Sequence, residues 1–102
     1  MKVDLLYDEG CPNWRTVADY LSQILEEVAF TLQCRESSTL GAEQAALYRG
    51  SPTILIDGHD PFVGVDEHVE PACRIYLTPE GIAGAPTLDQ LRAAITTKRG
   101  PK

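Results

Sequence analysis

The residue best placed to do chemistry is a cysteine between a predicted strand and a predicted helix. The apolar run VDLLY, the turn DEGCPNW and a long helical pattern follow one another between Lys2 and Val28. Pro12 suits the first position of the helix, because the N–H that proline lacks has no partner there. Cys11 then lies at the N-cap or next to it, where backbone N–H groups and the helix dipole favour a thiolate. We therefore expect Cys11 to be a reactive or ligand-binding thiol.

The charges around this thiol act in opposite directions. Asp8 and Glu9 precede Cys11 and disfavour its anion, whereas Arg15 follows it and favours the anion. The sign of the net effect stays open. A cysteine that is only a remnant of the fold remains the alternative to a reactive one.

Apolar periodicity predicts the elements that follow the turn. Spacings of three and four residues predict an amphipathic first helix, whose buried stripe consists of Val17, Leu21, Ile24, Leu25 and Val28. Alternation over residues 30–35 predicts a half-buried strand with Cys34 on its apolar face. Residues 40–49 predict a short helix that Gly50 ends.

A second central strand is predicted in the middle of the chain. The continuous β-prone run at residues 53–56 is typical of a strand covered on both faces, and Asp57-Gly58 is a turn signal that closes it. Residues 59–72 show no sustained period, so they predict a long connection.

The last third of the chain predicts one more strand and one more helix. Residues 73–77 alternate as a strand does, and a turn at residues 78–81 ends it. Thr87 and Gln90 have the spacing of a capping box at the start of the final helix. The buried stripe predicted for that helix consists of Leu88, Leu91 and Ile95.

Length and charge limit the class of protein. The 102 residues suffice for one domain, which we place at residues 1–96, followed by a flexible basic tail at residues 97–102. A net charge of −6 argues against a surface for nucleic acid or anionic membranes. No stretch approaches the roughly 20 apolar residues of a membrane span, and no signal-peptide pattern begins the chain, so we expect a cytoplasmic protein.

The cysteines and histidines show no spacing typical of a metal site or a disulfide framework. Cys11, Cys34 and Cys73 are an odd number of thiols, which suits a reducing compartment. His59 and His68 lie with several acidic residues in the long connection, but without a recognised zinc spacing. We expect a solvated acidic loop there, and neither a metal nor a cofactor.

The order of the predicted elements, strand, helix, strand, helix, strand, strand and helix, resembles the thioredoxin-like superfamily in its short, glutaredoxin-like form. Cys11-Pro12 matches the turn after the first strand, and Ser51-Pro52-Thr53 matches the cis-proline element of the family. The stretches GCPNW, GSPTILIDG, CRIY and GIAGAP together resemble small bacterial thioredoxin-like proteins, some of which are labelled alkylmercury lyase-like. The resemblance covers nearly all of the chain. It implies an α/β fold with a four-stranded mixed sheet and a cis Ser51–Pro52 bond.

One position departs from the family pattern. Thioredoxin-like oxidoreductases usually carry two cysteines as CxxC, and Trp14 stands here at the second position. The resemblance then implies a monothiol cycle, in which Cys11 attacks a disulfide or takes up glutathione. An external thiol, or else Cys34 or Cys73, would resolve the mixed disulfide. Both of these cysteines belong to strand patterns, so we expect them to be structural and less accessible than Cys11.

The resemblance also implies a substrate groove beside the thiol. Its expected residues are Pro12, Trp14, Ser51, Pro52 and Thr53. Trp14 is either a platform for the substrate or a cover for the first helical turn. The expected partners are a thiol or disulfide substrate, glutathione or a partner protein, without nucleic acid or membrane, and the oligomeric state stays open. Two alternatives remain: a non-catalytic binding module that uses the same groove, and a protein that binds heavy metals through its thiolate.

Overall fold

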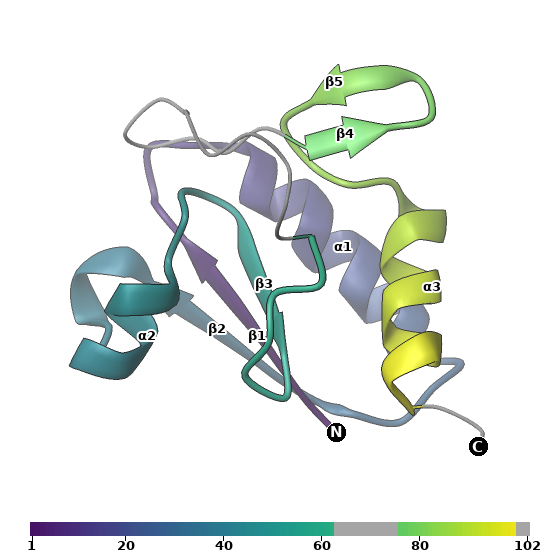
Figure 1. Cartoon of the computed structure of the whole chain (residues 1–102), viewed down its shortest axis with the longest axis horizontal. Coiled ribbons are helices and arrows are strands. Elements are labelled where there is room, and N and C mark those ends of the chain that lie inside the picture. Colours follow the sequence, from purple (N-terminus) through teal and green to yellow (C-terminus); the bar gives the residue numbers. More distant parts are fainter. Residues whose placement is uncertain (63–75, 100–102) are drawn as a thin grey trace.

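A mixed three-stranded sheet lies at the centre of the structure (Figure 1), a computed structural model that describes residues 1–62 and 76–99. The strands are β1 (Lys2–Tyr7), β2 (Thr31–Glu36) and β3 (Thr53–Ile56), in the order β2-β1-β3. β1 is parallel to β2 and antiparallel to β3. β1 is the central strand, and four consecutive residues of it are buried. A strand that is covered on both faces is expected to have a nearly continuous apolar run, as β1 does.

Two helices cover one face of this sheet. α1 (Asn13–Leu25) connects the parallel strands β1 and β2, and α3 (Leu88–Arg99) lies next to α1 (Figure 1). Apolar side chains from both helices and from the sheet form the core, which consists of Val3, Leu5, Val17, Leu21, Ile24, Ile54, Ile56, Tyr76, Leu91 and Ile95. Full burial of each large apolar side chain contributes about 1.5–3 kcal/mol. Of the two predicted stripes, Val17, Leu21, Ile24, Leu91 and Ile95 are buried. Leu88 and Val28 are only partly buried against the core, Val28 lies beyond the end of α1, and Leu25 is 40% exposed.

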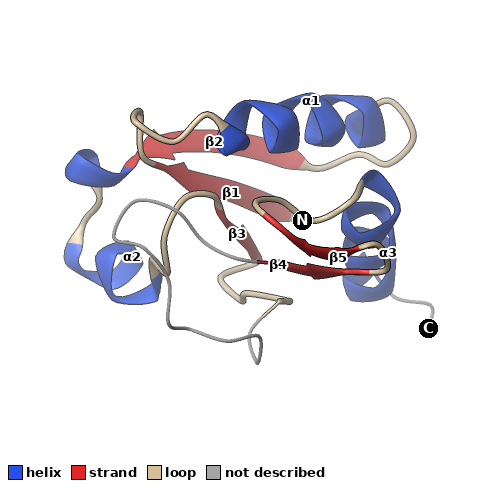
Figure 2. Cartoon of the chain, turned by 90° about the horizontal axis from the view of Figure 1, so that it is seen from above, coloured by secondary structure: helices blue, strands red, loops and turns tan. Residues whose placement is uncertain are grey.

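The other face of the sheet has a much smaller cover. It consists of the one-turn 3₁₀ helix η1 (Ser37–Thr39) and the short helix α2 (Ala42–Leu47). Figure 2 shows α1 and α2 on opposite sides of the central strands. The sequence predicted α2 over residues 40–49, and the observed helix is shorter at both ends. Its alanines are mostly exposed, so little buried apolar surface stabilises further turns.

The predicted four-stranded sheet is not seen among the described residues. β4 (Tyr76–Thr78) instead pairs antiparallel with β5 (Gly81–Ala83) as a separate two-stranded sheet. The sequence analysis missed β5, because its small residues show no alternating pattern. Gly81 has a φ of 115°, which a side chain would disfavour, and it allows the chain to reverse directly after Pro79 and Glu80.

Local sequence signals elsewhere are confirmed. The Thr87 N–H donates to Gln90 Oε1 at 2.9 Å and the Gln90 N–H donates to Thr87 Oγ1 at 3.0 Å, which is the predicted capping box. Asp57 and Gly58 both have positive φ and close a tight turn after β3. α3 continues to Arg99, so residues 97–99 belong to this helix and not to a tail.

Several predictions fall outside the described residues. These are most of the long connection at residues 59–72 and the beginning of the strand predicted at residues 73–77. Cys73 and the last three residues of the chain also lie there.

Candidate functional site

Cys11 lies in a turn held by backbone hydrogen bonds immediately before α1. The Cys11 N–H donates to the Asp8 carbonyl at 3.0 Å, and the Gly10 N–H donates to Asp8 Oδ1 at 2.7 Å. Pro12 is the N-cap, and its carbonyl accepts from the Arg15 N–H at 3.1 Å. The helix thus begins one residue later than predicted. Cys11 is next to the N-cap, one of the two predicted positions.

The thiol of Cys11 faces the loop that leads into β3. Cys11 Sγ donates to the Ser51 carbonyl oxygen, with a sulfur–oxygen distance of 3.5 Å. The Ser51–Pro52 peptide bond is cis, as the resemblance implied. Two segments separated by 40 residues in the sequence therefore meet at the thiol, which is the central feature of this candidate site.

Side chains on both sides hold this loop in place. Thr53 Oγ1 donates to the Gly50 carbonyl at 2.6 Å and accepts from the Arg49 N–H at 3.0 Å. The Tyr76 hydroxyl of β4 donates to the Pro52 carbonyl. Thr53 is buried and hydrogen-bonded within its own loop, so its position is structural.

The accessibility predicted for the site is wrong. Cys11 and Ser51 both have no exposed surface, whereas the sequence analysis expected Cys11 to be the more accessible thiol and placed Ser51 in a substrate groove. Both residues lie where the turn before α1 meets the cis-proline loop, at the hydrogen bond from Cys11 Sγ to the Ser51 carbonyl. Gly84 adds to the packing at the first turn of α1, because a Cβ there would lie 2.1 Å from Asn13 Nδ2.

Trp14 covers the start of α1. Its ring stacks on the ring of Tyr7, with centroids 4.1 Å apart and an interplanar angle of 23°. The Arg15 guanidinium carbon lies 5.2 Å from the centroid of the Trp14 ring. Since these neighbours already contact the ring, the structure favours the covering role of Trp14 over that of a substrate platform. Trp14 Nε1 is buried without a hydrogen-bond partner in the described part of the chain.

The sequence analysis missed Tyr48, which ends α2 and lies near the thiol. Burial raises the pKa of Tyr48 to about 12, and the charges of Asp8 and Cys11 act in the same direction. Two polar atoms of this region, Tyr48 Oη and Ser51 Oγ, are buried and lack a hydrogen bond of ordinary geometry within the described residues. No periodicity marks Tyr48 as part of a site, because its position depends on where the short helix α2 lies.

Tyr48 makes stability depend on pH in the alkaline range. The neutral phenol is favoured in the folded state, so its contribution is complete below pH 10 and is lost as the pH rises towards 12. We expect Tyr48→Phe to reduce the decline of the free energy of unfolding between these values. Urea denaturation at a series of alkaline pH values measures this, with Tyr20→Phe as the control for loss of a phenol elsewhere. Parallel curves for wild type and Tyr48→Phe would contradict the expectation.

The environment of Cys34 also differs from the prediction. Cys34 is exposed on β2, the first strand in the order β2-β1-β3, and is not a buried small side chain. Partial desolvation nevertheless raises the pKa of the Cys34 thiol, so less of it is thiolate near neutral pH. If Cys34 acts as the resolving thiol, it is accessible to a mixed disulfide, but only a small fraction of it is the reactive thiolate.

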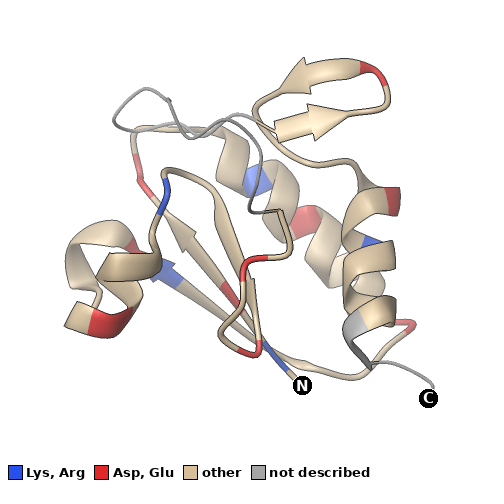
Figure 3. Ribbon diagram, viewed as in Figure 1, with Lys and Arg blue, Asp and Glu red and all other residues tan. Residues whose placement is uncertain are grey.

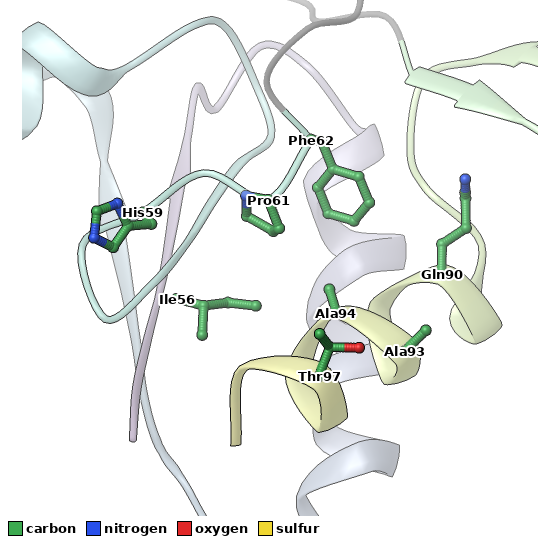
Figure 4. Close-up of a pocket in the computed structure, with 8 residues that line it drawn as sticks. All are labelled: Ile56, His59, Pro61, Phe62, Gln90, Ala93, Ala94 and Thr97. Carbon is green, nitrogen blue, oxygen red and sulfur yellow. The ribbon is translucent and has the colours of Figure 1, made fainter. Parts of the chain in front are cut away.

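Away from Cys11, a hollow of about 540 Å³ lies between the turn after β3 and helix α3 (Figure 4). Ile56, Pro61 and Phe62 contribute to its apolar lining. The Gln90 side chain at its rim is already engaged, because Gln90 Nε2 donates to the Leu77 carbonyl at 2.9 Å and Gln90 Oε1 accepts in the capping box. The other polar residues of its lining are His59 and Thr97.

The described residues contain no group of three or more histidine, cysteine or acidic side chains that could hold a metal ion. In the same part of the chain no helix is both long and apolar enough to cross a membrane. The chain matches no protein family model, no curated protein and no solved structure. The candidate function therefore depends on the geometry around Cys11.

Proposed function

We propose that this protein is a monothiol thiol–disulfide oxidoreductase of the thioredoxin-like superfamily, in which Cys11 is the reacting thiol. The observation that supports this most is the contact of Cys11 Sγ with the Ser51 carbonyl, at the loop with the cis Ser51–Pro52 bond. A thiol beside a helix start and an extended backbone segment lie together at this point. After a local opening exposes Cys11, the backbone beside Pro52 would hold a disulfide next to the attacking sulfur.

The proposed reaction is a two-step exchange with glutathione or with a disulfide of a partner protein. The Cys11 thiol loses its proton, and the thiolate attacks the glutathione sulfur of a partner protein that carries glutathione in a mixed disulfide. The glutathione passes to Cys11 in a new mixed disulfide, and the partner's thiolate leaves and takes up a proton. Trp14 occupies the position at which related proteins carry a second cysteine, so a second glutathione thiolate attacks the glutathione sulfur of the adduct. This step returns the Cys11 thiol and oxidised glutathione, in a reducing cytoplasm that supplies the second thiol.

One observation favours a second candidate function, a binding module without turnover. Cys11 has no exposed surface, and reactivity of a thiol requires access as well as thiolate. In this alternative the Cys11 S–H holds the cis-proline loop as a structural donor, and the surface around Trp14 and Pro12 binds a partner.

A variant with a single cysteine distinguishes the two functions. We expect the Cys34→Ser/Cys73→Ser protein to gain one glutathione per chain on treatment with oxidised glutathione, detected by intact mass. Addition of Cys11→Ser should abolish the adduct, and excess reduced glutathione should remove it from Cys11. The rate should be limited by the opening that exposes the buried thiol.

The matched control is the same reaction in urea, which shows that Cys11 reacts when it is accessible. If Cys11 is modified in urea but stays unmodified in the folded protein, the redox proposal fails. The binding module then becomes the better account of the site.

A further inference from the structure

A carboxylate without a partner lies on the sheet face opposite the main core. Asp4, in the middle of β1, is 3% exposed, and its Oδ1 is buried without a hydrogen-bond partner in the part of the chain that the structure describes. Side chains alternate along a strand, so Asp4 faces away from Val3 and Leu5, which belong to the core. A buried carboxylate is costly unless a donor or a cation compensates it. Asp4 therefore requires an explanation.

Asp4 lines a cleft of about 650 Å³ between the sheet and α2. Glu43 and Asp57 also line it, and Lys2 is its one basic lining residue. Asp57 is partly engaged, because its Oδ1 accepts from the Lys2 N–H at 2.8 Å. Figure 3 shows the acidic residues of β1, α2 and the turn after β3 around this part of the molecule. Three carboxylates against one ammonium give the cleft a negative charge.

A neighbouring arginine does not neutralise Asp4. Arg35 lies on β2, two residues after Gln33, which is opposite Asp4 in the register. The Arg35 guanidinium donates to Gln33 Oε1 at 2.7 Å, and no ion pair joins it to Asp4 among the described residues. Asp4 therefore has no ion pair, and its Oδ1 has no hydrogen bond, among the residues that the structure describes.

The rest of the lining indicates what kind of cation fits. Leu47, Leu55 and Ala46 give the cleft an apolar part, and its volume falls within the range of small-molecule sites. A metal ion requires several ligands close together, and the described residues present no such group. An ammonium group needs only one carboxylate and nearby oxygen atoms. An attached carbon chain would cover Leu47, which is 40% exposed.

We propose that this cleft binds a small aliphatic amine, whose ammonium group pairs with Asp4 and whose carbon chain lies against Ala46 and Leu47. Binding supplies the donor that the buried carboxylate lacks. The site is independent of Cys11, so the inference does not depend on the redox proposal.

Titration calorimetry with 1,5-diaminopentane at low ionic strength tests this site. We expect saturable binding at one site, and Asp4→Asn should weaken it about tenfold or more, the size expected for a hydrogen bond to a charged group. Glu80→Gln is the matched control, because it removes the same charge from the exposed turn between β4 and β5 and should leave binding unchanged. The uncharged 1,5-pentanediol should not bind. No binding by the wild type, or equal effects of the two variants, would overturn the proposal.

Two further measurements test the amine site: the thermal midpoint of Asp4→Asn and the amide resonances of the wild type with the amine bound. The variant should have a higher thermal midpoint than the wild type, because it removes a buried charge that no group compensates. A lower midpoint would show that Asp4 already has a partner and would overturn the proposal. In the wild type, 1,5-diaminopentane should shift the amide resonances of Asp4, Leu47 and Leu55. Shifts confined to exposed acidic residues elsewhere would show only weak surface attraction and would also overturn it.

Discussion

Replacement of Tyr76 by alanine is expected to lower the free energy of unfolding by about 3–5 kcal/mol, the usual range for loss of a buried aromatic side chain. Tyr76 is 1% exposed and is the largest of the fully buried side chains in the described structure. Its ring contacts the ring of Phe62 edge to face, with centroids 5.3 Å apart. Its hydroxyl donates to the Pro52 carbonyl, so this one residue joins the β4–β5 hairpin to the cis-proline loop. Urea denaturation measures the change.

Two matched variants separate the contribution of the Tyr76 hydroxyl from that of its buried ring. Tyr76→Phe keeps the ring and removes the hydroxyl, so it should cost about 1–3 kcal/mol, because the buried Pro52 carbonyl loses its donor. Ile82→Ala truncates a side chain on the same hairpin that is 74% exposed, and it should change stability by less than about 0.5 kcal/mol. If Tyr76→Ala costs no more than Ile82→Ala, the hairpin does not depend on this packing.

Alkylation of the native protein by iodoacetamide is expected to be about 100-fold faster at Cys34 than at Cys11, measured in a Cys73→Ser variant. Cys34 is exposed, whereas Cys11 has no accessible surface and reacts only after a local opening. An opening that costs about 3 kcal/mol slows the reaction by roughly two factors of ten. Peptide mapping of the modified protein over time gives both rates.

The pH dependence of the faster reaction provides an independent check. Because desolvation raises the pKa of the Cys34 thiol, its rate should still increase at pH values where an ordinary cysteine has reached its plateau. In urea the two cysteines should react at similar rates, which is the control for intrinsic reactivity. Equal rates in the folded protein would show that Cys11 is open to reagents. That result would strengthen the redox proposal over the binding module.

The sequence by itself determined the elements that depend on nearby residues. The buried residues Val17, Leu21 and Ile24 of α1, the Thr87–Gln90 capping box and the Asp57-Gly58 turn were all predicted and are present. Each depends on side chains within a few positions of one another, so one stretch of sequence contains the whole signal. The position of Cys11 next to a helix start was predicted for the same reason.

The sheet shows where local patterns stop being sufficient. The sequence predicted strands near the observed β2, β3 and β4, but a strand pattern does not contain its pairing partner. β4 pairs with β5, a strand that carries no alternation, and the described residues form two sheets in place of the predicted one. Partner choice depends on contacts between whole segments, which appear only in the assembled chain.

Only the tertiary structure decided which side chains are accessible and which polar groups have partners. Cys11 is buried where its turn meets the cis-proline loop, and Cys34 is exposed on β2, an outer strand of the described three-stranded sheet. Tyr48 lies near the Cys11 thiol because α2 ends there. Asp4 lines the cleft between the sheet and α2, and its Oδ1 has no hydrogen-bond donor among the described residues. Exposure and hydrogen-bond satisfaction depend on what packs against a residue from distant parts of the chain, and no local spacing of residue types contains that information.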